Sequence, residues 1–199
     1  MKVKIKKEGK VKEFKLINSW SDVTLETWLK LIDFETGTKT EEATETIAAL
    51  SDIPKQLIKE LSLSDVAVIM SKVGELQAKQ DTKLKRIIEI NGVEYGFHPD
   101  LDSISLGEYA DIEQFIKNGI DKQLPELMSV LYRPVKLKKN DIYIIDAYDG
   151  DIRLRAEEMK LMSAEQVQSA LVFFYTLGKV LSEIMPLYLM ERLTEMKTQ

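Results

Sequence analysis

The stretch SWSDVTLETWLKLI, residues 19–32, predicts a capped amphipathic helix, and its pattern returns as DSISLGEYADIEQFI at residues 102–116. In the first stretch, apolar side chains recur at the i, i+3, i+4 and i+7 spacing of one helix face. They are Leu25, Trp28, Leu29 and Ile32. Polar residues before this stripe, Thr24 among them, can accept hydrogen bonds from the first helical turn. The chain therefore starts a helix twice with similar residues.

The two stretches align position by position. Val23-Thr24-Leu25 matches Ile104-Ser105-Leu106, Trp28 matches Tyr109, and Leu31 matches Ile112. The hydroxyl would start each helix, the leucine would be its first buried contact, and the aromatic ring would pack back on the preceding hairpin. This interpretation places Trp28 and Tyr109 in the core. An internal duplication and two unrelated core helices both explain the likeness.

A β-hairpin is predicted before each helix start. Apolar side chains alternate with lysines in residues 1–16, and in residues 84–99 β-branched residues flank Asn91-Gly92, a strong hairpin signal. Further helices are expected at residues 40–50, 51–61, 62–76 and 123–132. These patterns predict one lobe over residues 1–80 and a second over residues 84–199, with a single compact domain as the alternative.

Two helix starts have the spacing of a capping box, in which a hydroxyl and the side chain three residues later bond each other's backbone. They are Ser105 with Glu108, and Ser163 with Gln166. The second precedes a long apolar helix, expected over residues 167–197 with a kink at Pro186. The chain thus ends differently from its two similar halves.

Two more elements are expected between these capping boxes. Residues 142–145, IYII, form a strand or a loop, and residues 152–161 form a helix. The predicted fold is therefore α+β and predominantly α-helical. It has two small β-hairpins, each followed by helices, and a long C-terminal helix.

The long C-terminal helix is apolar on more than one side, so more than one side must be covered. One set of its side chains would face the domain and the other would need a further partner. That second set is Phe173, Val180, Met185 and Leu189. It is covered either by the second half of the protein, as in a core helix, or by another chain. If another chain covers it, these four residues are the candidate partner-binding site.

Composition excludes several classes of chemistry. The sequence has no cysteine and one histidine, His98, so thiolate chemistry and sulfur-ligated metals are excluded. The apolar segments are interrupted by charges and prolines, so no membrane span is expected. The stretch DAYDGD does not place its residues as a calcium loop requires. The usual phosphate-binding and hydrolase motifs are missing from the sequence, and neither catalysis nor a cofactor is expected.

Two basic segments raise the alternative of nucleic-acid binding. Residues 1–15 carry seven lysines against two glutamates, and a second cluster follows Tyr132 in residues 133–139. The formal net charge of −5 argues against a dedicated nucleic-acid protein. Solvation of the two segments is the simpler interpretation.

The order of these motifs resembles small proteins encoded among the virion genes of tailed bacteriophages. The resemblance rests on SWSDVTLETW after a short hairpin, INGVEY in the second hairpin, LGEYADIE, and the late apolar segment SALVFFYTLG. Such proteins are tail assembly chaperones, or components of the neck or capsid. The resemblance implies a non-enzymatic protein-binding factor, located in the host cytoplasm or the virion.

Its expected partners are other structural proteins of the phage, with a homo-oligomer as an alternative. A nucleic-acid-associated regulatory protein of the phage is the rival function. An enzyme of unrecognised type stands third.

Overall fold

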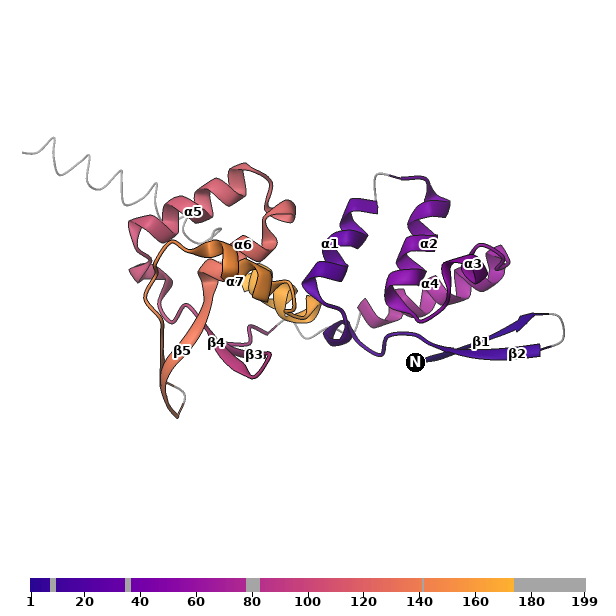
Figure 1. The fold of residues 1–199 in the computed structure, drawn as a ribbon, viewed down its shortest axis with the longest axis horizontal. Helices are drawn as coiled ribbons and strands as arrows, with labels where there is room; N and C mark the ends of the chain where they lie inside the picture. Colours follow the sequence, from indigo (N-terminus) through magenta and orange to yellow (C-terminus); the bar gives the residue numbers. More distant parts are fainter. Residues whose placement is uncertain (8–9, 35–36, 78–82, 141, 174–199) are drawn as a thin grey trace, which may run out of the picture.

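Two lobes lie end to end and meet near the start of one helix (Figure 1). The computed structural model describes residues 1–7, 10–34, 37–77, 83–140 and 142–173. The first lobe contains β1 (Lys2–Lys7), β2 (Lys10–Lys15), a 3-10 turn η1 (Trp20–Asp22), α1 (Leu25–Phe34), α2 (Lys39–Leu50), α3 (Lys55–Ile58) and α4 (Leu63–Gln77). The second lobe contains β3 (Ile87–Ile90), β4 (Val93–Phe97), η2 (Leu101–Ser103), α5 (Leu106–Lys117), η3 (Ile120–Lys122), α6 (Leu124–Leu131), β5 (Tyr132–Lys139), β6 (Ile142–Ile145) and α7 (Ile152–Met159).

The first lobe pairs a β-ribbon with four helices. β1 and β2 are antiparallel, with Lys2 opposite Lys15, which confirms the hairpin predicted at the start of the chain. One side of the ribbon is buried and the other is wet, because apolar and lysine residues alternate along the strands. The buried cluster of this lobe includes Val3, Ile5, Leu16, Trp20, Val23, Ile47, Leu50, Ile53, Ile58, Ile69 and Val73.

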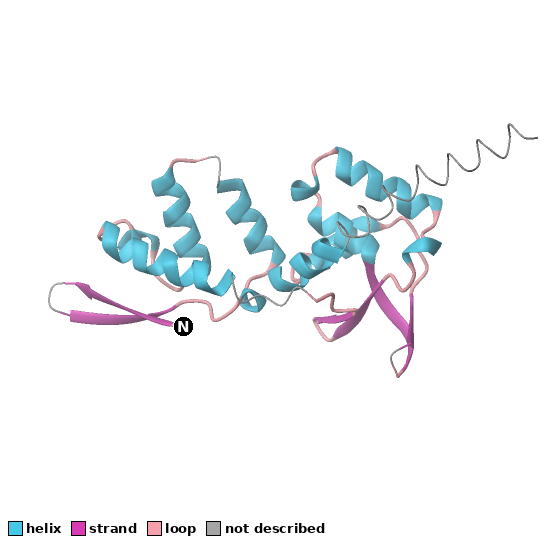
Figure 2. Ribbon diagram, turned by 180° about the vertical axis from the view of Figure 1, so that it is seen from behind, coloured by secondary structure: helices cyan, strands magenta, loops and turns pink. Residues whose placement is uncertain are grey.

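The second lobe is organised around a four-stranded antiparallel sheet in the order β3-β4-β5-β6, with helices packed beside it (Figure 2). Asn91 and Gly92 both have positive φ, at 52° and 79°, as a two-residue turn between β3 and β4 requires. At Gly96 a Cβ atom would lie 2.5 Å from the Tyr143 ring, so β6 packs closely over β4. The Tyr143 hydroxyl donates to the carbonyl of Phe97 at 2.6 Å.

The predicted architecture of two hairpins and a long C-terminal helix is wrong. The second hairpin is half of the four-stranded sheet, because β5 pairs with β4 and residues 142–145 form β6 rather than a loop. Burial along β5 is graded and does not alternate: Tyr132 and Arg133 are buried, whereas residues 136–139 are exposed. Of the helix predicted over residues 167–197, residues 167–173 are helical, in a helix that begins at residue 164, and the remainder lies outside the described residues.

The two lobes repeat one local structure at a constant separation of 81 positions. Leu16 forms a β-bridge with Ser51 in the first lobe. In the second lobe Phe97 pairs with Tyr132, and each of these residues lies 81 positions after its counterpart. The amide of Ile17 donates to Leu50, and its counterpart in His98 donates to the carbonyl of Leu131. Matching turns, η1 and η2, precede matching helices, α1 and α5. The duplication suggested by the sequence is therefore present in the backbone.

The lobes are joined where the first helix start meets the end of α7. Thr24 bridges Ser163, and the carbonyl of Val23 accepts from the Ala164 amide at 2.7 Å. Leu25 belongs to the buried cluster of the second lobe, whereas Ala164 belongs to that of the first. Each core thus contains a residue from the other half of the chain.

Candidate functional site

The second helix start, residues 104–109 at the beginning of α5, is the candidate site. Ser105 caps the helix by accepting from the amide of Glu108 at 3.3 Å. In return, Glu108 Oε2 accepts from the Ser105 amide at 2.8 Å and from its hydroxyl at 2.6 Å. This confirms the predicted capping box. The box directs the Glu108 side chain toward the sheet rather than into solvent.

Beneath this helix start lies a buried ion pair between Glu108 and Arg133 of β5. Glu108 is 3% exposed and Arg133 is 4% exposed, and Glu108 Oε1 accepts a hydrogen bond from Arg133 Nη1. Burial raises the pKa of Glu108, but the hydrogen bonds from Ser105 and Arg133 outweigh it and hold the pKa below its ordinary value of 4.5. The carboxylate stays ionised and ties α5 to the sheet.

Tyr148 closes the network above Arg133. Its ring centroid lies 5.7 Å from the guanidinium carbon, within the range of a cation–π contact. The hydroxyl donates to Asp111 Oδ2 on α5. Burial and the neighbouring Asp111 carboxylate raise the pKa of Tyr148, so the hydroxyl keeps its proton. The ring also stands against Gly107, which forms one wall of the site.

His98 completes the buried group and makes it sensitive to acid. Its Nε2 lies 3.5 Å from Glu108 Oε1. Burial lowers the pKa of His98 below its ordinary value of 6.5, although Glu108 opposes the shift. The unfolded chain therefore takes up this proton at a higher pH than the folded protein does. Glu108 also favours the unfolded chain as the pH falls below about 4.5, because its carboxylate takes up a proton at a higher pH in the unfolded chain than in the folded protein.

We predict that the free energy of unfolding falls as the pH is lowered from 7. Loss begins near pH 6.5 through His98 and continues below about pH 4.5 through Glu108, because both pKa values are depressed in the folded state. Urea unfolding at a series of pH values measures the slope. The His98→Asn variant should flatten the curve between about pH 6.5 and 5, and an unchanged slope there would contradict the assignment to His98.

The two matched helix starts differ in what covers them. Leu25 is 0% exposed, whereas its counterpart Leu106 is 83% exposed. Trp28 packs against both buried clusters, whereas Tyr109 is 55% exposed. The prediction of core contact is confirmed for Trp28 and wrong for Tyr109. The difference arises from residues 160–164, which are hydrogen-bonded to the first helix start, whereas no described residue makes the corresponding backbone bonds to the second.

A second apolar surface lies on the outer face of the β5–β6 hairpin. Leu137 pairs with Ile144 across the two strands, and both side chains are exposed, as is Ile142. β6 is an edge of the sheet, because it pairs with β5 alone in the strand order. A register shift between Val135 and Leu137 makes Lys136 the extra residue of a bulge in β5, the strand next to this edge.

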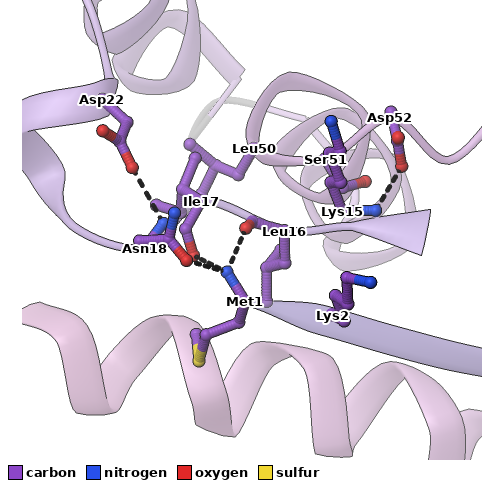
Figure 3. A pocket seen from close by; sticks show the side chains of 10 residues that line it. All are labelled: Met1, Lys2, Lys15, Leu16, Ile17, Asn18, Asp22, Leu50, Ser51 and Asp52. Atoms are coloured by element: carbon purple, nitrogen blue, oxygen red, sulfur yellow. Dashed lines mark hydrogen bonds between the residues drawn. The ribbon is translucent and has the colours of Figure 1, made fainter. Parts of the chain in front are cut away.

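Two hollows lie on the surface of the first lobe. One of about 490 Å³ lies beside the start of β1 (Figure 3). Its polar groups bond one another: the Lys15 amide donates to Asp52 at 2.6 Å, and the Asn18 amide donates to Asp22 at 2.9 Å. Another of about 740 Å³ lies between α2 and α4, with Ile47 and Leu63 in its lining.

The structure places the predicted partner-binding residues only in part. The half-buried Phe173 ring stands edge-on to Phe97, with centroids 5.4 Å apart, so it contacts the core of the second lobe. Val180, Met185 and Leu189 lie outside the described residues. Those three remain predictions.

The basic cluster predicted in residues 133–139 is divided by the fold. Arg133 is buried against Glu108, and Lys138 pairs with Glu94 at 2.6 Å, which leaves Lys136 and Lys139 on the exposed part of β5. Within the described ranges, three potential metal ligands come together nowhere, including around His98. In that same portion of the chain, every helix is too short or too polar to cross a bilayer.

Sequence reasoning found Glu108 as a capping residue but missed its ion pair with Arg133. Nothing near Arg133 in the sequence indicates this partner, which lies 25 positions earlier in the chain. Comparison with family models, curated proteins and solved structures gives no match to this chain.

Proposed function

We propose that this protein is a non-enzymatic protein-binding factor in the assembly of a tailed-bacteriophage particle. It acts as a tail assembly chaperone or as a small structural component of the virion, in the host cytoplasm or in the particle. The resemblance of SWSDVTLETW, INGVEY and LGEYADIE to virion-associated phage proteins supports the class. The exposed second helix start supports the mode of action.

The observation that carries the proposal is the exposure of Leu106 and Tyr109, whose counterparts in the first lobe are covered by residues 160–164 of the same chain and by the buried clusters. Burying a leucine side chain contributes about 1.5–3 kcal/mol. Tyrosine is enriched among the residues that dominate protein interfaces. A partner that covers this surface therefore gains binding energy from a helix that is already fixed in place.

The buried ion pair beneath Leu106 and Tyr109 keeps the start of α5 ordered before a partner binds. Glu108 and Arg133 fix α5 from below, and Asp111 holds it through Tyr148. A surface ordered before binding loses less conformational entropy when the partner arrives. Other phage structural proteins are the proposed partners, and a second copy of this chain is the alternative.

The test is capture of partners from phage-infected cells by the tagged protein, together with mass spectrometry of purified particles. The wild-type protein should recover a tail or capsid protein, and Leu106→Glu and Tyr109→Glu should each reduce recovery at least tenfold. Leu63→Glu is the matched control, because Leu63 is the first residue of α4, follows a capping serine and is 89% exposed.

The distribution of the protein separates the two roles. Absence from mature particles indicates a chaperone, and a fixed copy number in them indicates a structural component. Recovery of no particle protein by the wild type would contradict the proposed function. Equal loss with Leu63→Glu would contradict the assignment of the partner surface to the second helix start, because a new charge at either exposed leucine would then reduce capture.

A further inference from the structure

The first helix start shows what such a surface binds. The amide of Leu25 donates to the carbonyl of Met162 at 2.7 Å, and the amide of Glu26 donates to that of Lys160 at 3.0 Å. The Ala164 amide returns a bond to Val23. Three backbone hydrogen bonds thus hold residues 160–164 across the start of α1. This segment is the internal ligand of the first helix start.

The internal ligand is the end of a helix followed by an apolar residue. α7 ends at Met159, and the turn after it is closed by the Lys160 amide donating to Ala156 and the Met162 amide donating to Met159. Met159 and Met162 are fully buried in the same cluster as Leu25. The chain that follows a helix end has carbonyls without a partner in the helix, and α1 donates to two of them, those of Lys160 and Met162.

The second helix start has the same backbone groups in the same order. The counterparts of Val23, Leu25 and Glu26 are Ile104, Leu106 and Gly107. The Ile104 carbonyl and the amides of Leu106 and Gly107 make no hydrogen bond to any residue that the structure describes. Their apolar neighbours Leu106 and Tyr109 are exposed. The same set of binding groups is therefore present at both helix starts, but the described part of the chain contains a segment that binds only the first of them.

We infer that the second helix start binds the end of a helix from a partner protein, with a methionine or a similar unbranched apolar side chain seated on Leu106 and Tyr109. Two carbonyls of the partner accept from the amides of Leu106 and Gly107, and one partner amide donates to Ile104. The inference rests on the proposed function for the existence of a partner and adds the chemistry of the segment that it presents.

The side chains around the site fit this ligand. Gly107 replaces Glu26 and removes a side chain from the rim, so the partner backbone meets less obstruction there. Tyr148 stands beside Gly107, 3.6 Å from the position that a Cβ would occupy, and offers an apolar ring at the edge. Flexible methionine adapts to such irregular apolar surfaces, as Met159 and Met162 do in the internal ligand.

The probe that tests the inference is a synthetic peptide with the sequence of the internal ligand, IRLRAEEMKLMSAEQ, residues 152–166. Added to the isotope-labelled full chain, it should shift the amide NMR signals of residues 104–109. A control peptide with Met159 and Met162 replaced by serine should bind at least tenfold more weakly. Leu106→Glu should abolish the shifts, and Gln114→Glu, an exposed change on the same helix, should leave them intact.

Disulfide trapping removes the dependence on affinity. The chain has no cysteine, so Ala110→Cys places one thiol beside the site and Lys117→Cys places one at the far end of α5. A peptide with an added carboxyl-terminal cysteine should trap at position 110 at least ten times more than at position 117. Equal trapping, or NMR shifts confined to residues 23–26 or to residues beyond 173, would overturn the inference.

The outcome is separable from that of the proposed function. If particle proteins are captured but neither Leu106→Glu nor the peptide has an effect, the inference fails and the function stands. If the peptide binds at residues 104–109 and no particle protein is ever recovered, the proposed function fails and the chemistry assigned to the site stands.

Discussion

Replacing Arg133 with methionine is expected to lower the free energy of unfolding by about 3–5 kcal/mol. The substitution leaves the Glu108 carboxylate ionised and buried without its guanidinium partner, and buried charge without a partner is costly. Urea denaturation at pH 7 measures the loss. The loss should shrink as the pH is lowered, because without Arg133 burial raises the pKa of Glu108 relative to the wild type and protonation then removes the stranded charge.

The double variant Arg133→Met with Glu108→Leu is the control for that prediction. Removing both charges leaves an apolar contact of similar size, which in other buried pairs is neutral or stabilising. The double variant should therefore be more stable than Arg133→Met alone. If the two variants are equally destabilised, the loss comes from packing around Tyr148 rather than from the ion pair.

The Leu25→Ala variant is expected to lose about 3 kcal/mol of unfolding free energy, because a fully buried leucine leaves a cavity at the junction of the lobes. Leu106→Ala, the same change at the matched position, should alter the free energy by less than about 0.5 kcal/mol, since its side chain is exposed. Paired urea denaturation curves make the comparison. Equal losses would mean that Leu106 is covered in the isolated protein.

Local signals in the sequence predicted local structure well. The Asn91-Gly92 turn, the Ser105 capping box, the Ser163 capping box and the α7 helix all lie where the residues indicated. Each depends on side chains within four positions of one another. The similarity of residues 23–25 and 104–106 also pointed to the backbone repeat, because a cap and its helix are encoded together.

Long-range pairing could not be read from the same signals. The basic pattern of residues 133–139 favours solvation, because no residue near Arg133 in the chain indicates that Glu108 pairs with it. The pattern of residues 142–145 fits a strand or a loop, because the residues that contact β6, such as Val135 and Gly96, lie on other strands. Strand assignment depends on neighbours that the linear pattern does not identify.

The exposure of Leu106 escaped prediction for a related reason. Leu25 and Leu106 follow equivalent caps and carry equivalent side chains, so their local sequences predict the same burial. The difference arises from residues 160–164, which pair with one copy and not with the other. Periodicity identifies the apolar face of a helix, but the segment that covers the face is chosen by the whole fold.

The pairing of α1 with residues 160–164 also sets an order of events during translation. About 135 residues separate Leu25 from Lys160, and at about 5–20 residues per second the ribosome takes roughly 7–27 seconds to supply them. Throughout that interval the nascent first helix lacks the segment that buries Leu25. A ribosome stalled before Lys160 would therefore display on α1 the same kind of uncovered surface that the finished protein retains on α5.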